Sequence, residues 1–227
     1  MALLGQGVLA IWNGIAAGAE DEFVAWHVRE HIPERVSLPG FLRGRRYVAL
    51  EGFPRYFNFY ETGSAADLTS EAYRARLNAP TDWTRSVVRH FTDTTRTVCA
   101  VAHSRGRGEG GWVETVRIPE VADRDSFRSA IRSRILEPAT QCPGIVAAHL
   151  LVGEAAASGG ATAEKDLRKE PDKVVAWILL VEGIGPEALR AARIAVTGDA
   201  QLVACGAPAA GIERGLYALQ FALSDAS

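Results

Sequence analysis

The hydrophobic pattern of the chain switches repeatedly between the strand period and the helix period. Short apolar or alternating runs bounded by turn residues predict strands, and apolar residues that recur at helical spacing predict helices. We expect strands at 7–15, 41–50, 55–61, 94–103, 112–118, 145–152, 174–181 and 216–223, and helices at 19–32, 71–77, 82–91, 123–136 and 187–196. This order predicts an α+β protein made of two ferredoxin-like β-α-β-β-α-β repeats.

The two predicted repeats define the expected domain organisation. Each ferredoxin-like sheet has helices on one face only, so its other apolar face needs a partner. We therefore expect the two sheets to pack face to face as an intramolecular barrel within one chain. The first repeat, with the candidate site, covers 1–105, a glycine-rich linker covers 106–110, and a degenerate second repeat covers 111–227.

The first predicted helix carries two histidines on its apolar side. At 100° per residue, Val24, Val28 and Ile32 share one stripe, with His31 inside it and His27 at its edge. Burying an unpartnered polar ring costs about 1–3 kcal/mol. Each ring is therefore either a core histidine with a hydrogen-bond partner or part of a binding or catalytic site.

The second repeat has isoleucines where the first repeat has these histidines. Adding 104 to the residue number converts Phe23 to Phe127, His27 to Ile131, His31 to Ile135 and Pro39-Gly40 to Pro143-Gly144. We predict that the histidines line a ligand pocket in the first repeat and that the corresponding space in the second repeat is filled by Ile131 and Ile135. Pro33 lacks a helix-forming N–H, so we also expect the first helix to kink or end near Ile32.

Imidazole chemistry makes His31 the candidate general acid or base, with His27 as its helper. An unperturbed histidine has a pKa of about 6.5 and can exchange a proton near neutral pH. Glu34 could orient His31. A histidine pair at i and i+4 can also bind a metal, but no third ligand follows at a recognisable spacing, so we predict no metal site.

Several residues near this helix are candidates for binding a substrate. Tyr56, Asn58 and Tyr60 share one face of a strand, where they could line a pocket or meet the opposing sheet inside the barrel. Arg45 and its neighbours could bind an acidic group or simply occupy an exposed strand edge. Indole and phenol rings also offer surfaces suited to a flat ligand. The candidate substrate-binding residues are therefore Trp26, Arg45, Tyr47, Tyr56, Asn58 and Tyr60.

A long segment in the second repeat, Glu154 to Asp172, is rich in Ala, Ser and Gly and then in charge. This composition offers little to bury and is typical of a flexible loop. We expect it to be the most mobile internal segment and to be able to act as a lid.

Composition narrows the function classes. A net charge of −2 and a pI near 6.2 provide no general attraction to nucleic acid or anionic membranes. Three dispersed cysteines indicate neither a disulfide framework nor a zinc site and fit a reducing cytoplasm. No apolar run reaches the roughly 20 residues of a membrane span, and no nucleotide-binding fingerprint is present.

The residues Trp26-His27, Glu30-His31-Ile32-Pro33, Leu38-Pro39-Gly40 and Arg45-Arg46-Tyr47 form a pattern that resembles the EthD-like group of the dimeric α/β-barrel superfamily. The resemblance implies two ferredoxin-like sheets facing each other, here fused into one chain. It implies activities as diverse as cofactor-free oxygenation of aromatics, lactone isomerisation, polyketide cyclisation and haem chemistry, so it does not select one reaction.

Two hypotheses about function follow. The first is an enzyme that uses the histidine pair, without a cofactor, on a small organic molecule of aromatic, polyketide-like or lactone type. Haem stays open as a cofactor under this hypothesis. The second is a non-catalytic ligand-binding or assembly protein. Self-association into a homodimer is compatible with both.

Overall fold

The computed structural model describes residues 3–168 and 170–225, and its strands close into one antiparallel barrel. Around the barrel the order is β1-β3-β2-β8-β5-β7-β6-β4, and each of these neighbouring pairs is antiparallel. The strands are β1 (Gly7–Ile15), β2 (Phe41–Gly52), β3 (Tyr56–Thr62), β4 (Phe91–Gly106), β5 (Trp112–Ile118), β6 (Ile145–Gly153), β7 (Trp177–Gly183) and β8 (Glu213–Ser224). The expected barrel within a single chain is confirmed.

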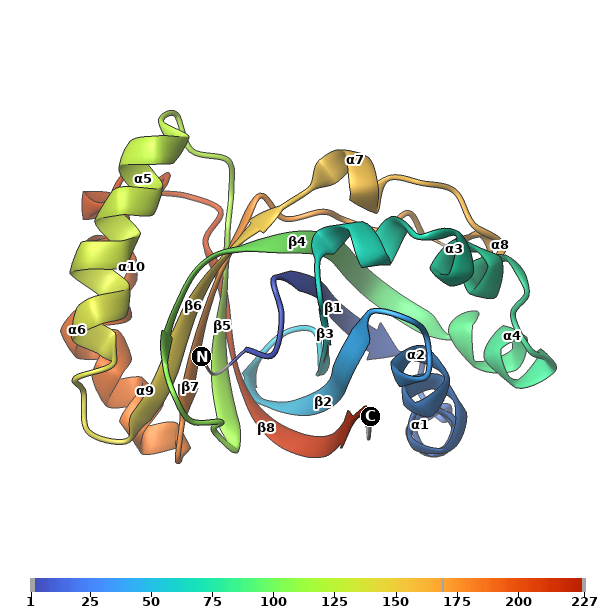
Figure 1. The fold of residues 1–227 in the computed structure, drawn as a ribbon. Coiled ribbons are helices and arrows are strands. Elements are labelled where there is room, and N and C mark those ends of the chain that lie inside the picture. Colours follow the sequence, from blue (N-terminus) through green and yellow to red (C-terminus); the bar gives the residue numbers. More distant parts are fainter. Residues whose placement is uncertain (1–2, 169, 226–227) are drawn as a thin grey trace.

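Helices cover the barrel on two opposite sides (Figure 1). One side carries α1 (Glu20–Trp26), η1 (His27–His31), α2 (Ile32–Val36), η2 (Ala65–Thr69), α3 (Glu71–Asn78) and α4 (Asp82–Val88). The other side carries α5 (Arg124–Ile131), η3 (Arg132–Leu136), α6 (Glu137–Ala139), α9 (Pro186–Ala192), η4 (Arg193–Thr197) and α10 (Asp199–Ala204). No helix among residues 3–168 and 170–225 is long and apolar enough to cross a membrane.

The sequence pattern located every strand, but some element boundaries were wrong. Residues 104–106, expected to lie beyond the strand with the linker beginning at 106, extend β4 and pair with β6. The helix expected at 82–91 ends at Val88, and Phe91 begins β4. The short helix α10 was not expected. These errors lie where tertiary pairing or capping, and not hydrophobic period, decides where an element ends.

The first helix passes through a π-helical turn and continues beyond Ile32, so of the expected kink or end the end was wrong. The turn spans His27 to His31, and the amide of Ile32 donates to the carbonyl of His27. The helix then continues with Pro33 in the first turn of α2. A π turn re-satisfies backbone groups through longer-range bonds, and such turns are frequent at functional sites. A second π turn, η3, occupies the corresponding helix of the other half.

Strand alternation separates the barrel interior from the surfaces beneath the helices. On β3, Phe57 and Phe59 belong to the interior cluster, whereas Tyr56 and Tyr60 pack with helix-side residues. This follows from the period of two along a strand. The expected split of the β3 faces is confirmed, but Tyr56, Asn58 and Tyr60 face helices and do not meet the opposing sheet inside the barrel.

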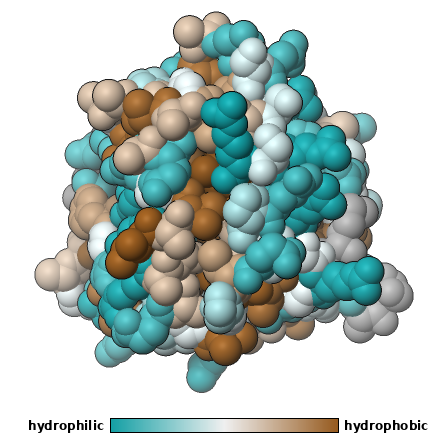
Figure 2. Space-filling view, turned by 90° about the vertical axis from the view of Figure 1, so that its left-hand side faces the viewer, coloured by the Kyte–Doolittle hydropathy of each residue, from teal (hydrophilic) through white to brown (hydrophobic). Residues whose placement is uncertain are grey.

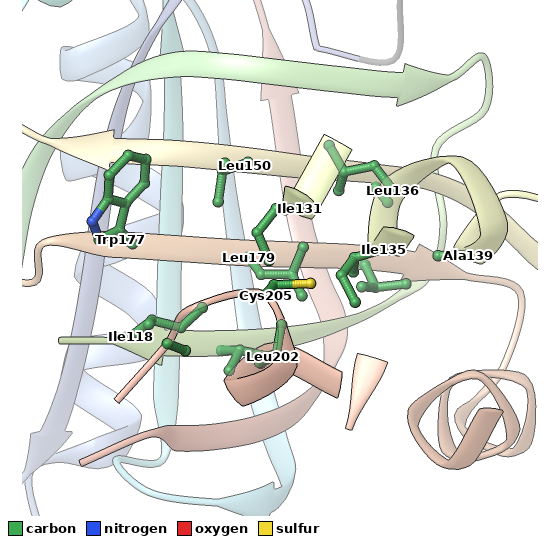
Figure 3. Close-up of a cluster of buried hydrophobic side chains, with 14 of the residues drawn as sticks. Ile118, Ile131, Ile135, Leu136, Ala139, Leu150, Trp177, Leu179, Leu202 and Cys205 are labelled. Carbon is green, nitrogen blue, oxygen red and sulfur yellow. The ribbon is translucent and has the colours of Figure 1, made fainter. Parts of the chain in front are cut away.

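The helices of the second half cover a mainly apolar layer, in which the buried Glu114 is an exception that pairs with Arg193 of η4. Figure 3 shows Ile131, Ile135 and Leu179 within this cluster, between the α5–α6 helix and the sheet. The outer surface of the same helices mixes polar and apolar groups (Figure 2). Ile194 of η4 and Ile184 after β7 are among the most exposed large apolar side chains, at 82% and 73%.

Candidate functional site

Both histidines line an enclosed cavity of about 30 Å³, referred to below as the His cavity. This volume is close to the share of one water molecule in the liquid. Five of the predicted site residues meet there: Trp26, His27, His31, Asn58 and Tyr60. The rest of its wall consists of Leu9, Ile11, Arg35, Tyr73, Phe91, Thr94, Arg96, Glu164 and Arg168.

The two imidazoles are buried and poorly satisfied by hydrogen bonds. His27 Nε2 and the Tyr60 hydroxyl share a hydrogen bond of 3.2 Å. The Nδ1 atoms of His27 and His31 have no partner among the described residues, and neither does Oδ1 of Asn58. The His31 ring packs on Trp26 with a centroid distance of 4.2 Å. Three residues of one cavity wall thus each carry an unpartnered polar atom, which indicates that water or a ligand completes the site after a small rearrangement.

Both histidines are held in the neutral form. Burial lowers the pKa of His27 well below its usual value, and the positive charges of Arg46 and Arg35 lower it further. Burial and Arg35 likewise lower the pKa of His31. A neutral imidazole with a free ring nitrogen can accept a proton at pH 7, which is what a general base requires.

The structure adds three arginines that sequence patterns did not single out. Arg35 is buried one turn beyond His31 and forms ion pairs with Glu34, at 3.0 Å, and with Glu164. Arg168 forms an ion pair with Asp172 at 2.8 Å. Burial of Arg35 opposes its charge, but Glu164 and other acidic groups outweigh this effect and raise its pKa.

Arg96, the third arginine, is only 6% exposed and has no ion pair with a carboxylate in the described part of the chain. One of its terminal nitrogens donates to the Tyr73 hydroxyl at 2.9 Å. Burial opposes its charge, yet nearby acidic groups and Tyr73 raise its pKa, so it stays protonated. A buried guanidinium without a carboxylate is expensive unless a ligand supplies the negative charge.

The predicted flexible segment covers the His cavity and is called the lid, residues 154–172. It contains α7 (Ala155–Ser158) and α8 (Ala163–Asp166), so the expectation of a loop with nothing to bury was wrong. Ser158 is buried and accepts from the Val98 amide at 2.9 Å, and Glu164 of α8 is 8% exposed against Arg35. Polar pairing, which composition does not reveal, holds this segment down.

Mobility of the lid stays a prediction. We expect limited proteolysis of the native protein to cut first within residues 154–172, because α8 is held mainly by the Arg35–Glu164 pair and by the amide of Ala163 donating to Asn78 Oδ1 at 3.1 Å. Glu164→Gln should accelerate this cleavage several-fold, and Glu187→Gln, on the opposite side of the barrel, should not. Equal resistance along the chain, measured by mass spectrometry of early fragments, would contradict the prediction.

Two larger open pockets flank the lid. One, of about 300 Å³, is lined by Arg74, Arg96 and Lys165 among others, and another, of about 460 Å³, is lined by Lys165 and Arg168. Arg96 belongs to the walls of both the His cavity and the first outer pocket, and Arg168 to the walls of the His cavity and the second. These two arginines therefore stand between the enclosed cavity and the surface.

Three predicted substrate-binding residues lie outside the His cavity. Arg45 and Tyr47 point into the barrel, where Arg45 pairs with Glu182 at 3.2 Å and with Glu61 at 3.1 Å. The alternative of an exposed strand edge is also wrong, because Arg45 is 2% exposed. Tyr56 stacks against Phe23 with a centroid distance of 4.7 Å. Barrel closure places Arg45 and Tyr47 in the interior, which strand alternation alone does not predict.

Glu34 does not orient His31, contrary to expectation. Its carboxylate forms ion pairs with Arg35 and Arg76 instead. Helix geometry explains this, because the π turn and α2 direct Glu34 to the arginine side of the helix while His31 faces Trp26.

The second half has an apolar core at the corresponding place. Ile131 and Ile135 are buried against the sheet, as Figure 3 shows. On β7, the residues that face this helix layer include Trp177, Leu179 and Val181, where β3 has Tyr56, Asn58 and Tyr60. The second half is thus apolar at the positions that correspond to His27 and His31, and its buried polar group, Glu114, lies elsewhere under η4.

Cofactor binding was tested against the site. No three His, Cys, Asp or Glu side chains come together as a metal site in the parts of the chain that the structure describes. The His cavity has no room for a porphyrin, and neither outer pocket is lined by His, Cys, Met or Tyr that could ligate haem iron. The residues present do not fit haem as they are placed.

Comparison with known proteins identifies the fold and no closer relative. No protein-family model and no curated protein sequence matches the chain. A candidate monooxygenase from Fusobacterium nucleatum has a similar structure, with a TM-score of 0.62, 10% identity and coverage of 98% of this chain and 96% of its own. An anthrone oxidase-like protein has a TM-score of 0.62 and 16% identity, with coverage of 97% and 93%.

A third similar structure is a candidate chlorite dismutase, with a TM-score of 0.54, 10% identity and coverage of 95% of each chain. Identities this low carry information about architecture only. The three structures and the closed eight-stranded barrel agree on one architecture. The chain therefore has the dimeric α/β-barrel fold.

Proposed function

We propose that this protein is a cofactor-independent enzyme that removes a proton from an activated C–H group of an aromatic or polyketide-like compound. The observation that carries the proposal is the pair of buried, neutral imidazoles, each with an unpartnered ring nitrogen, that line a cavity beside the lid. The chain is proposed to be a tandem ferredoxin-like repeat of EthD-like type, with its site in residues 1–105 and a structural second repeat.

Each residue has a distinct role in this proposal. His31 is the general base, because its side chain has no hydrogen bond that proton uptake would break. His27 supports it, oriented by the Tyr60 hydroxyl. Trp26 supplies a flat surface beside His31, and Asn58, with an unpartnered carbonyl oxygen, accepts a hydrogen bond from the ligand.

The closed cavity requires that the lid moves before a substrate enters. Ligand pockets usually measure about 300–1,000 Å³, and the His cavity has about 30 Å³. Opening α8 would join the His cavity to the outer pockets, whose walls already share Arg96 and Arg168 with it. Closure then excludes water from the base, as lids do in many enzymes.

Anthrone is the first probe, because one similar structure is an anthrone oxidase-like protein and because anthrone has an acidic methylene group between two aromatic rings. In deuterated buffer without oxygen, the enzyme should exchange the methylene protons faster than buffer alone, measured by NMR. In air, anthrone and O₂ should give anthraquinone and water. His31→Gln should slow exchange at least about 100-fold, whereas His103→Gln, outside the cavity, should not.

The pH dependence provides a second check. The base is active when neutral, and its pKa lies well below 6.5, so the exchange rate should stay flat down to about pH 6.5 and fall only at more acidic pH. Binding of anthrone without any exchange or oxidation would support the alternative, a non-catalytic ligand-binding protein. If the protein neither binds anthrone or a lactone analogue nor exchanges their protons, both the enzyme proposal and the ligand-binding alternative are contradicted.

A further inference from the structure

We infer that the ligand of this site is an organic anion, and that Glu164 of the lid occupies the place of its negative charge when the site is closed. The inference rests on the proposed function only in placing ligand and base in one site. It adds the chemical class of the ligand and a reason for the lid to close over an empty site.

Guanidinium groups outnumber carboxylates around the His cavity by one when Arg76, which shares Glu34 with Arg35, is counted. Arg35, Arg96 and Arg168 line the cavity, and Glu164 is the one carboxylate on its wall among the described residues. Asp172 neutralises Arg168 from outside the wall, and Glu34 and Glu164 share Arg35. Both histidines are neutral, and among the described residues no carboxylate forms an ion pair with Arg96; Tyr73, Asp172 and Glu164 raise its pKa, but the two carboxylates are paired with other arginines.

Glu164 differs from the other carboxylates because it belongs to the movable lid. Glu34 lies next to Arg35 on the same helix and stays with it. Glu164 arrives on α8 from the other half of the chain, so lid opening removes it. Opening therefore leaves two buried guanidinium groups, Arg35 and Arg96, that an incoming carboxylate or phenolate can bind through charge-assisted hydrogen bonds.

The position of Arg96 suits it to hold the anion at the entrance to the base. It is shared by the His cavity and the outer pocket of about 300 Å³, whose wall also carries Arg74 and Lys165. An aromatic body fits in a pocket of that size. A ligand whose negative group binds Arg96 could therefore place its ring in the outer pocket and its reactive carbon near His31.

The test compares 2-naphthoate with its neutral isostere 2-naphthamide by isothermal titration calorimetry on the full chain. The wild type should bind naphthoate at least about tenfold more tightly. Arg96→Met, which keeps an apolar stem, should reduce this preference to about one. Glu164→Gln should raise naphthoate affinity about fivefold or more and leave naphthamide unchanged, because it removes the competing carboxylate. Arg89→Met, at an exposed site beyond α4, is the matched control.

Equal binding of the two probes by the wild type would overturn the inference, and so would no binding of naphthoate to either the wild type or Glu164→Gln. If Arg96→Met does not fold, the opposite effect of Glu164→Gln still decides. The proposed function fails separately: anion preference without proton exchange removes the catalytic proposal and leaves the anion site. Proton exchange of neutral probes without anion preference removes the anion site and leaves the catalytic proposal.

Discussion

Replacing His27 and His31 together with isoleucine, the residues of the second half, is expected to abolish proton exchange while leaving the protein folded. Once Tyr60→Phe is added to remove the hydroxyl that His27 leaves unpaired, the unfolding free energy at pH 7 should change by no more than about 1 kcal/mol, because packed aliphatic groups replace poorly satisfied polar rings. Exchange should fall at least about 100-fold. Urea unfolding and NMR exchange measure the two effects on the same samples.

The same variant should lose the acid sensitivity that the histidines impose. The folded pKa of each ring is lowered, so below about pH 6.5 the unfolded chain binds protons that the folded chain does not. The stability conferred by the neutral rings is therefore complete above about pH 6.5 and declines as the pH falls. The slope for two histidines is at most about 2.7 kcal/mol per pH unit, and the variant should lack it.

Tyr60 provides the control for this experiment. Loss of His27 leaves the buried Tyr60 hydroxyl without its partner, which can cost about 1–3 kcal/mol. Adding Tyr60→Phe should recover that loss. A stability loss above about 3 kcal/mol that Tyr60→Phe does not recover, together with intact exchange, would show that the histidines serve a structural hydrogen bond instead of a site.

The largest loss of stability is expected for Glu182→Leu inside the barrel. Glu182 is 1% exposed and accepts hydrogen bonds from Arg45, at 3.2 and 3.4 Å, and from the Gly110 amide at 3.1 Å. Although burial opposes its charge, His149 and Arg45 lower the pKa of Glu182 to about 2. Removing one partner of a buried ion pair costs about 3–5 kcal/mol, and urea unfolding at pH 7 should show this.

A double variant separates the charge effect from packing. Arg45→Met with Glu182→Leu should cost less than Glu182→Leu alone, because it also removes the buried guanidinium that would keep only Glu61 as a partner, while Glu61 keeps its ion pair with Arg43 at 2.7 Å. Glu187→Leu, whose carboxylate is 80% exposed beside Arg190, should change stability by less than about 1 kcal/mol. A cost below about 1 kcal/mol for Glu182→Leu would show that the interior network is dispensable.

Local pattern was sufficient for the elements and for part of the site. The period of two on β3 placed Tyr60 and Asn58 on one face of the strand, and the helical period placed His27 and His31 on the apolar side of their helix; the structure brings these two faces together. Comparison of the two halves showed which copy is polar. These inferences depend on contacts within one repeat, where sequence spacing and spatial spacing are closely linked.

Contacts between the halves could not be obtained in this way. The position of Arg45 in its strand is equally compatible with a surface site and with the barrel interior. The pairing of β2 with β8, which closes the barrel, brings it to Glu182 on β7. In the sequence, nothing distinguishes Arg96 from an ordinary charged residue on a long strand. The lid composition predicted a flexible loop with little to bury. It could not reveal that Glu164 is buried, because the partner of Glu164 is Arg35 from the other half.

The sequence by itself determined the order of the strands and of the longer helices, the closure of the strands into a barrel within one chain, and the histidine pair in the first half. The tertiary structure alone decided that a lid from the second half covers the site, that among the described residues no carboxylate forms an ion pair with Arg96 there, and that Arg45 belongs to the barrel interior. The reason is physical: hydrophobic period follows from local geometry, whereas burial and pairing of charges depend on which distant segments the barrel brings together.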